Sequence, residues 1–246
     1  MSVAIQNIIP VIHAKWFGNN ESCSIDNVSI DSRSLQNNSG TLFFALVGQH
    51  HDGHQYLSEL IEKGVQHFVV NHIPEKLTDK ANFLVVENTL EALQQFAAFY
   101  RQKFDFPIIG ITGSNGKTIV KEWLNFLLSP EYNIIRSPKS YNSQVGVPLS
   151  VIGINEKHNL GIFEAGISLV GEMEKLGNII QPTLGILTNI GSAHNEGFAS
   201  EEEKIREKLK LFDNAPVVIL QKNEKIEAFL KPKTKAFTWS FDNASA

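Results

Sequence analysis

Several features that mark large classes of protein are scarce in this sequence. A single cysteine, Cys23, stands among 246 residues, which excludes an internal disulfide framework and suits a reducing compartment. No apolar run reaches the roughly 18 residues that a membrane-spanning helix needs, and the amino terminus has no basic segment ahead of its apolar residues. We therefore expect a cytoplasmic protein without membrane insertion.

An excess of positive charge is also lacking. The formal net charge is -4 and the sequence pI is about 6.1, so nothing marks the basic surface that nucleic-acid binding usually requires. With 42% apolar and 20% charged residues, the composition is that of an ordinary globular protein. A chain of this length can bury a sizeable core, and we expect two domains rather than one.

Residues 1–104 are predicted to form a compact amino-terminal α/β domain. The segment Asp105-Phe106-Pro107 is a suitable joint, because proline restricts the residue before it and tends to end a preceding helix. Apolar patterning places strands at residues 28–30, 41–47, 67–70 and 81–86, and helices at residues 55–63 and 90–104.

Residues 105–246 show a more regular alternation of strands and helices. Such alternation predicts a parallel sheet that is covered on both faces, and ligands of these sheets bind beyond the carboxyl ends of the strands. The predicted fold class is α/β, with a small amino-terminal α/β domain followed by a parallel-sheet domain that carries a phosphate loop. Strands are expected at residues 107–111, 132–136, 160–163, 184–188 and 216–220, helices at 117–128, 171–180 and 200–213, and a loop at 137–148.

The stretch GITGSNGKT, residues 110–118, joins an expected strand to an expected helix. In a phosphate loop, glycines permit a tight turn, backbone N–H groups from Ser114 to Thr118 can hold phosphate oxygens, and the helix start adds a favourable dipole. Ile111 replaces the first glycine of the strict pattern, and a plain glycine turn is the alternative. The residues expected at the nucleotide are Gly113, Ser114, Asn115, Gly116, Lys117 and Thr118.

Two further side chains follow strands that should end at the same sheet edge. Glu164 ends the apolar run 160–163, where a second magnesium ligand beside Thr118 would be needed, and His194 follows the strand 184–188. Taken alone, such a carboxylate is often solvated, and such a histidine is often a cap or a surface residue. The convergence of three motifs on one edge favours a joint functional role.

Lys208 lies beside the apolar stripe that Ile205, Leu209 and Phe212 form on the predicted helix 200–213. Partial burial disfavours an ammonium and lowers its pKa. A neutral amine can take up carbon dioxide and become a carbamate, which binds metal. A lysine that extends from the helix edge into solvent is the alternative.

The motifs GITGSNGKT, IFEAG, NIGSAH and EKLKLFDNA, in this order and spacing, resemble the central domain of the Mur ligases. These enzymes use ATP to form amide bonds in the synthesis of bacterial peptidoglycan precursors. The upstream segment SIDSRSLQNNSGTLFFALVGQHHDGHQYL is similar to the family's amino-terminal domain, which binds the UDP end of the muramyl substrate. Folylpolyglutamate synthetases share the central domain but lack this segment.

Within the family, TLFFALVG, RSPKSYNSQVGVPLSV and FEAGISLVGEMEKL most resemble members that add D-alanyl-D-alanine to a UDP-N-acetylmuramoyl tripeptide. The resemblance is particularly close to a version that is fused ahead of an alanine racemase. It implies ATP and Mg²⁺ as cofactors, and the tripeptide and the dipeptide as partners. The implied amino-terminal domain that binds the UDP-muramyl substrate covers residues 1–104, and the implied ATP-binding central domain covers residues 105–246.

The resemblance also implies individual roles at the two sites. Lys117 would bind the terminal phosphates, Thr118 and Glu164 would bind one magnesium ion, and His194 with carbamylated Lys208 would bind a second. Asn142 would lie near the terminal phosphate. The implied uridine pocket contains Asp31, Ser32, Arg33, Gly48 and His54.

Family members continue past residue 246, where they complete the central domain and add a carboxyl-terminal domain that closes over ATP. The chain is therefore expected to be a fragment with an incomplete central domain, which alone binds nucleotide poorly and turns over little. Three other functions stay open at this point. They are another Mur-type ligase, a phosphate-loop NTPase or kinase that would not need Lys208, and a non-catalytic module that binds the UDP-muramyl substrate.

Overall fold

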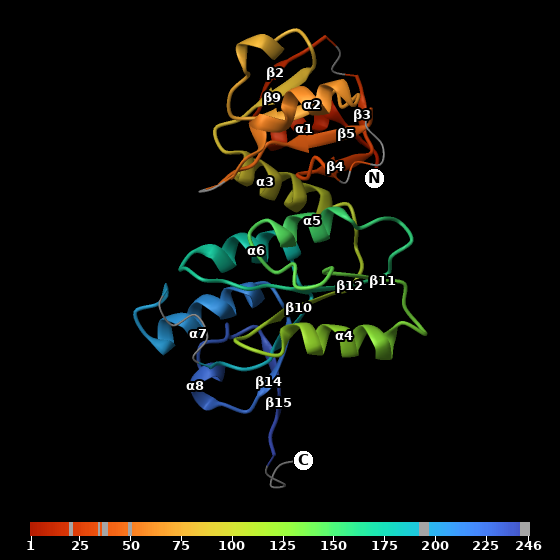
Figure 1. Ribbon diagram of the computed structural model, residues 1–246. Coiled ribbons are helices and arrows are strands. Elements are labelled where there is room, and N and C mark those ends of the chain that lie inside the picture. Colours follow the sequence, from red (N-terminus) through yellow and green to blue (C-terminus); the bar gives the residue numbers. More distant parts are fainter. Residues whose placement is uncertain (20–21, 34, 36–38, 49–50, 192–196, 242–246) are drawn as a thin grey trace. The chain divides into compact units, whose positions relative to one another are not determined.

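The computed structural model describes residues 1–19, 22–33, 35, 39–48, 51–191 and 197–241. The chain folds into two compact units, Met1–Phe99 and Tyr100–Ala246 (Figure 1). Helix α3 (Thr89–Arg101) contains this division. The predicted boundary between residues 104 and 105 falls in the turn that follows the helix.

The amino-terminal unit is built on a five-stranded sheet with the order β2-β9-β8-β5-β4. The strands β4, β5, β8 and β9 run parallel, and β2 pairs antiparallel with β9. Every residue of β5 and β8 is buried, which is typical of parallel strands covered on both faces. The strands of this sheet are β2 (Lys15–Phe17), β4 (Asn27–Ser29), β5 (Thr41–Phe44), β8 (His67–Val70) and β9 (Asn82–Val85).

Short elements complete this unit around an aromatic core. The rings of Phe43 and Phe68 lie 6.2 Å apart, and those of Phe68 and Phe83 lie 5.7 Å apart. Besides α3, the unit contains β1 (Val3–Ala4), α1 (Ile5–Val11), β3 (Ser24–Ile25), β6 (Val47–Gly48), β7 (His51–Asp52), the 3-10 helix η1 (Gly53–Tyr56), α2 (Leu57–Glu62) and the 3-10 helix η2 (Glu75–Leu77).

The second unit contains a six-stranded, entirely parallel sheet with the order β11-β12-β10-β13-β14-β15. The chain leaves β10, forms β11 and β12 on one side of it, and then forms β13 to β15 on the other side. This reversal makes the carboxyl end of β10 a switch point, where ligands of such sheets bind. The strands are β10 (Ile108–Thr112), β11 (Ile134–Arg136), β12 (Leu160–Glu164), β13 (Leu184–Leu187), β14 (Val217–Gln221) and β15 (Lys235–Trp239).

Helices cover both faces of this sheet, as Figure 1 shows for α4 and α5 on opposite sides of it. The central strands β10 and β12 are buried along their whole length for this reason. No helix in the described part of the chain is long and apolar enough to span a membrane. The helices are α4 (Lys117–Leu128), α5 (Gly146–Ile152), α6 (Glu172–Ile180), α7 (Glu201–Leu209), the 3-10 helix η4 (Lys210–Phe212) and α8 (Glu224–Glu227).

The predicted α/β class and parallel sheet are confirmed, but several boundaries were wrong. The expected loop 137–148 contains the start of α5. A helix can include Pro148 there because the N–H groups of the first helical turn have no carbonyl partner within the helix, so a proline breaks no hydrogen bond. The expected strand 41–47 ends at Phe44. The expected helix 200–213 divides into α7 and η4. Strands β2 and β15 were not predicted.

Candidate active site

The segment after β10 forms a tight turn that leads into α4. Gly113 has a φ of +141° and Gly116 a φ of +80°, which are values that favour glycine. A Cβ atom at Gly113 would collide with the hydroxyl of Thr188 and would lie 2.9 Å from the carbonyl oxygen of Asn189. The glycines of the predicted phosphate loop are therefore required by the backbone path itself.

The segment after β13 braces this loop. The N–H groups of Ser114 and Asn115 donate to the backbone and side-chain oxygens of Asn189, each over 2.9 Å. The Thr188 hydroxyl donates to the carbonyl of Asn115 over 2.6 Å, and the N–H of Gly191 donates to the Ser114 hydroxyl over 2.9 Å. These two N–H groups hold the loop together here, and their expected contact with a phosphate stays a prediction.

The start of α4 leaves other N–H groups at the loop. The first residues of a helix have no carbonyl partner one turn back, and α4 begins at Lys117 directly after the left-handed Gly116. Lys117 Nζ donates to the carbonyl of Gly113 over 2.9 Å. Burial lowers the pKa of Lys117, and the nearby Glu164 acts in the opposite direction. The ammonium therefore lies across the loop rather than in solvent.

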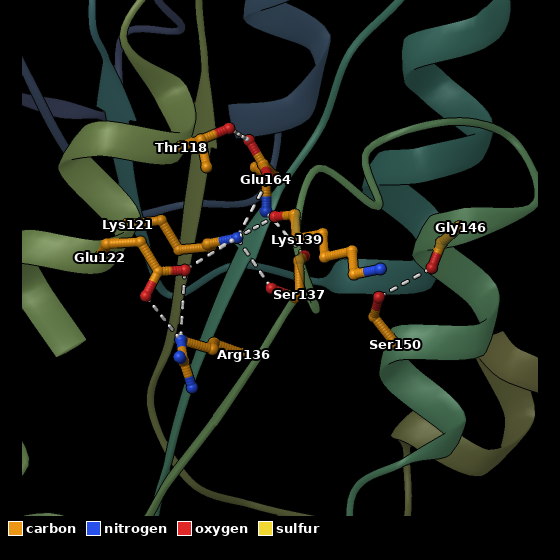
Figure 2. Close-up of polar contacts among 9 residues, drawn as sticks. All are labelled: Thr118, Lys121, Glu122, Arg136, Ser137, Lys139, Gly146, Ser150 and Glu164. Carbon is orange, nitrogen blue, oxygen red and sulfur yellow. Dashed lines mark hydrogen bonds and ion pairs between the residues drawn. The ribbon is translucent and has the colours of Figure 1, made fainter.

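Glu164 lies at the carboxyl end of β12, opposite Ile111 of β10. It is fully buried, so the alternative of a solvated strand-end acid was wrong. Its Oε2 accepts a hydrogen bond from the Thr118 hydroxyl over 2.9 Å (Figure 2). A hydroxyl and a carboxylate oxygen side by side are hard ligands of the kind that Mg²⁺ prefers.

Lys208 lies on α7 and is 1% exposed. It is buried more completely than the partial burial that we expected, and the alternative of a lysine extending into solvent was wrong. Its Nζ donates to the carbonyl of Gly113 over 3.3 Å, so α7 reaches the phosphate loop. Burial lowers the pKa of Lys208 to about 8, and repulsion by Lys117 and Lys204 adds to the effect.

Lys117, Asn142 and Lys208 line one cavity of about 250 Å³, together with residues of the segment 143–145 and the segment 166–168. Asn142 is held there because its carbonyl accepts from the N–H of Gly166 over 2.8 Å. The cavity is smaller than the roughly 300–1,000 Å³ of whole-ligand pockets, so it suits the phosphate end of a nucleotide. His194 lies outside the described residues.

A larger cavity of about 930 Å³ lies beyond the ends of β13 and β14. Thr188 and Asn189, which brace the phosphate loop, line part of it. It contains none of the predicted catalytic residues that the structure describes. We therefore take the smaller cavity, where the side chains of Lys117 and Lys208 meet, as the candidate active site.

The residues present fit a magnesium ion held jointly with phosphate. No group of three or more histidine, cysteine, aspartate or glutamate side chains that could hold a metal occurs within the described ranges. Thr118 and Glu164 would supply two oxygens to such an ion. Mg²⁺ characteristically takes one or two carboxylates and completes its shell with phosphate and water.

The predicted uridine-pocket residues lie in the amino-terminal unit. Asp31 and Arg33 form a two-pronged ion pair over 2.9 and 2.8 Å, and this pair lowers the pKa of Asp31 to about 2. His51 in β7 contributes to that lowering, so the β6–β7 hairpin, which contains Gly48, lies close by. Ser32 lies in the turn between the two charged residues.

His54 is buried and has one unsatisfied ring nitrogen. Its Nδ1 lies 2.7 Å from the Asp52 carboxylate, and its ring stacks on that of His72 with the centroids 4.4 Å apart. Among the described residues, its Nε2 has no hydrogen-bond partner. A buried polar atom without a partner is unfavourable by itself, which is consistent with a site that a ligand completes.

Sequence reasoning missed two buried charged residues near the loop. Lys121, one turn after Lys117 on α4, is fully buried and donates to Glu164. The four-residue spacing puts it on the same helix face as Lys117 but does not indicate its burial. Glu207 on α7 accepts from the N–H groups of Gly171 and Met173 at the start of α6. No local pattern indicated that contact.

Comparison with known proteins agrees with this geometry. Residues 111–246 match the family model described as Mur ligase middle domain, and residues 24–101 match the model described as Mur ligase family, catalytic domain. The first match covers more than half of the chain and contains the phosphate loop, Glu164 and Lys208.

Individual relatives carry one enzyme name. The UDP-N-acetylmuramoyl-tripeptide--D-alanyl-D-alanine ligase of a Synechocystis strain is 36% identical over 196 residues, which is 80% of this chain and 43% of that protein. The protein of the same name from Borreliella burgdorferi is 34% identical over 237 residues, 88% of this chain and 50% of that protein. A crystal structure of MurF from Acinetobacter baumannii is 25% identical, with a TM-score of 0.88, and the match covers 97% of this chain and 53% of that one.

The chain thus spans about half the length of the curated relatives that it matches. The two family models together match residues 24–101 and 111–246 of it. The chain belongs to the Mur ligase family.

Proposed function

We propose that the protein to which this chain belongs is an ATP-dependent ligase that joins D-alanyl-D-alanine to a UDP-N-acetylmuramoyl tripeptide. In this proposal residues 105–246 bind ATP and residues 1–104 bind the UDP end of the muramyl substrate. The relatives named above support the choice of substrates. Formation of a peptidoglycan precursor from ATP and a UDP-sugar is a cytoplasmic reaction, and we expect the protein in that compartment.

One observation carries the proposal. Lys117 and Lys208 both donate to the carbonyl of Gly113 in the phosphate loop, over 2.9 and 3.3 Å, while Thr118 donates to Glu164 over 2.9 Å. The amines of two lysines and two oxygens of the kind that bind magnesium therefore lie at one sheet edge. A kinase or NTPase would use Lys117, Thr118 and Glu164 in the same way. It would not need Lys208, the buried lysine of α7.

The chemistry explains why so much positive charge is needed. The terminal carboxylate of the tripeptide attacks the γ-phosphorus of ATP, so that a carboxyl O–P bond forms and the bond to the leaving ADP oxygen breaks. Both reactants are anions, and their approach is unfavourable unless cations intervene. Lys117 at the loop supplies one such cation. Asn142 lines the same cavity and in this proposal holds the phosphate that is transferred.

In the second step the amine of D-alanyl-D-alanine attacks the acyl carbon. The C–N bond forms, phosphate leaves, and the amine gives up its proton. Gly113, Ser114, Asn115 and Gly116 shape the loop, and the N–H groups at the start of α4 face the phosphates in this proposal.

Magnesium ions would supply further charge neutralisation and alignment of the phosphates when bound. Thr118 and Glu164 would hold the first ion. For the second we propose His194 together with a carbamate on Lys208, whose lowered pKa leaves part of the amine neutral and able to react with carbon dioxide. Loading with two ions and the carbamate are parts of the hypothesis.

The uridine nucleotide would contact the amino-terminal unit. The proposed contacts come from Asp31, Ser32 and Arg33, from Gly48 in the β6–β7 hairpin, and from His54, whose free Nε2 offers a hydrogen bond. A fused alanine racemase remains a prediction, as does the carboxyl-terminal ligase domain.

The deciding experiment measures phosphate release from ATP by the complete gene product. Release should require both a UDP-muramyl tripeptide and D-alanyl-D-alanine, and mass spectrometry should show the ligated pentapeptide. Release without the two substrates would instead indicate an NTPase, and release that requires a different amine would indicate another Mur-type ligase.

A non-catalytic binding module is tested with Lys208→Ala. If the proposal is right, this variant loses activity, and short carboxylic acids that replace the carbamate restore part of it. Unchanged affinity for the UDP-muramyl peptide, together with no wild-type activity to lose, would support the binding module.

A further inference from the structure

We propose that Lys121 is a positioning residue that fixes the Glu164 carboxylate for magnesium and at the same time fixes the backbone that leads to Asn142. The inference rests on the proposed function, because that function gives Glu164 and Asn142 their ligands. Lys121 itself touches neither substrate nor metal in this proposal.

The ammonium of Lys121 is completely enclosed. The side chain is 0% exposed, and Nζ points between α4, β12 and the segment after β11 (Figure 2). It donates to Glu164 Oε1 over 3.2 Å, to the carbonyl of Ser137 over 2.8 Å and to the carbonyl of Lys139. Nζ also lies 3.3 Å from the Glu122 carboxylate (Figure 2), so its three N–H donors face four acceptors.

The two oxygens of the Glu164 carboxylate have different partners. Oε1 faces Lys121, whereas Oε2 faces the Thr118 hydroxyl over 2.9 Å. The backbone N–H of Glu164 donates to the Ser137 hydroxyl over 3.2 Å. The carboxylate is therefore held from two directions, and the oxygen next to Thr118 is the one presented to the phosphate loop.

The same ammonium also holds a strained stretch of backbone. Lys139 has a φ of +49°, which is uncommon for a residue with a side chain. Such a conformation persists where its surroundings fix it, and the Lys139 carbonyl is bound by Lys121. Three residues later Asn142 reaches the small cavity. One buried charge therefore connects the candidate metal ligand to the candidate phosphate ligand.

A buried ammonium with this role should affect metal binding through Glu164. Groups that orient a metal ligand typically change metal affinity by about 10- to 100-fold when they are removed. A lysine that only fills space would change stability and leave metal affinity unaltered in the folded protein.

The test is a Mn²⁺ titration of the complete gene product, followed by electron paramagnetic resonance in the presence of a non-hydrolysable ATP analogue. Mn²⁺ takes the same oxygen ligands as Mg²⁺. Lys121→Met should raise the Mn²⁺ dissociation constant by about 10- to 100-fold. It should also weaken the binding of metal-free nucleotide, because the backbone that leads to Asn142 loses its anchor. In a Glu164→Gln background the same substitution should add little, because both changes act on one ligand.

Two further variants keep the result decisive. Lys63→Met removes an exposed lysine that pairs with Glu59, and it should bind Mn²⁺ as the wild type does. Lys121→Gln retains N–H donors for the two carbonyls but no charge for Glu164, so it should fold if Lys121→Met does not, and should still weaken Mn²⁺ binding.

Wild-type Mn²⁺ affinity in a folded Lys121 variant would overturn the inference. So would an equal loss in the Glu164→Gln background, or the failure of both Lys121 variants to fold, since each indicates a purely structural lysine. The proposed ligase function fails separately, by the absence of dipeptide-dependent ligation in the wild type, because the Mn²⁺ titration needs no turnover.

Discussion

In the amino-terminal unit the paired charges of Asp31 and Arg33 lie at the surface, with side-chain exposures of 39% and 86%. In the second unit Lys121 and Glu164 form a pair in which both side chains are 0% exposed. Water screens the first pair, so it can be broken at little cost. Water does not reach the second pair, so the loss of one partner leaves the other charge buried without the compensation of its partner, which strongly lowers stability.

The difference suits the two proposed tasks. A surface pair can open to accept a ligand and close again. Buried charges keep fixed positions, as the alignment of a carboxylate, a metal ion and a triphosphate requires. The following predictions test this contrast, from the largest expected effect to the smallest.

Glu164→Ala should lower the free energy of unfolding by about 3–5 kcal/mol. It removes the only buried carboxylate that the structure places beside the Lys121 ammonium among the described residues and leaves the partly exposed Glu122 as the remaining one. Urea denaturation followed by circular dichroism measures this change. The control is Glu59→Ala, which removes an exposed partner of Lys63 and should cost at most about 1 kcal/mol. Equal effects in the two variants would remove the contrast between buried and exposed pairs.

Lys117→Met should reduce kcat/KM for ATP by about 10²- to 10³-fold, the typical effect of removing one group that stabilises charge in a transition state. The measurement is dipeptide-dependent phosphate release by the complete gene product, and the fold of the variant is checked by thermal unfolding. Lys233→Met, in the loop before β15, is the matched control and should retain full activity. Retained activity in Lys117→Met would exclude the phosphate role.

Lys208 should make stability increase with pH. Its pKa in the folded protein is about 8, below the ordinary 10.5, so between these values the unfolded chain binds the proton more tightly and unfolding takes up a proton. The free energy of unfolding should therefore rise by about 1 kcal/mol per pH unit from pH 8 towards pH 10. Urea denaturation in buffer free of carbon dioxide measures the slope.

The control for this slope is Lys208→Met, which should lack that contribution while the other titrating groups stay the same. Identical slopes in the wild type and the variant would show that folding does not lower the pKa of Lys208. Added bicarbonate should also raise the free energy of unfolding of the wild type, but not that of Lys208→Met, if the carbamate forms only in the folded protein.

Arg33→Ala should have the smallest effect on stability at neutral pH, because the pair it breaks is exposed to water. Its clearer result is a change in the titration of Asp31, whose pKa is about 2 beside Arg33 and should return towards 3.8. The stabilisation from this pair is present above 3.8 and is lost as the pH falls towards 2. An NMR titration of the Asp31 carboxyl group measures the shift, and an unchanged midpoint would contradict the ion pair.

The strand, loop and helix around GITGSNGKT could be predicted because their signals are local. Glycine at Gly113 and Gly116 permits the backbone angles, and apolar runs mark the strands on either side. The end of β5 at Phe44 and the start of α5 at Gly146 were placed wrongly, because apolar residues continue past the first boundary and Pro148 obscured the second.

Two features of the candidate site could not be predicted from local signals. Asn189 takes the N–H groups of Ser114 and Asn115, and the two segments meet only because β13 lies next to β10. Lys121 resembles any helical lysine in sequence, and its burial depends on β12 and on the chain after β11. His194 lies outside the described residues and remains a prediction.

The sequence by itself determined the α/β class, the phosphate loop, the family, and which residue types stand at the ends of the parallel strands, because periodicity and glycine placement act over short distances. Only the tertiary structure decided how those residues are used. Sheet order brings β12 beside β10, so that Glu164, Thr118 and Lys121 form one buried network, and burial then makes each charge depend on a partner far away in the chain.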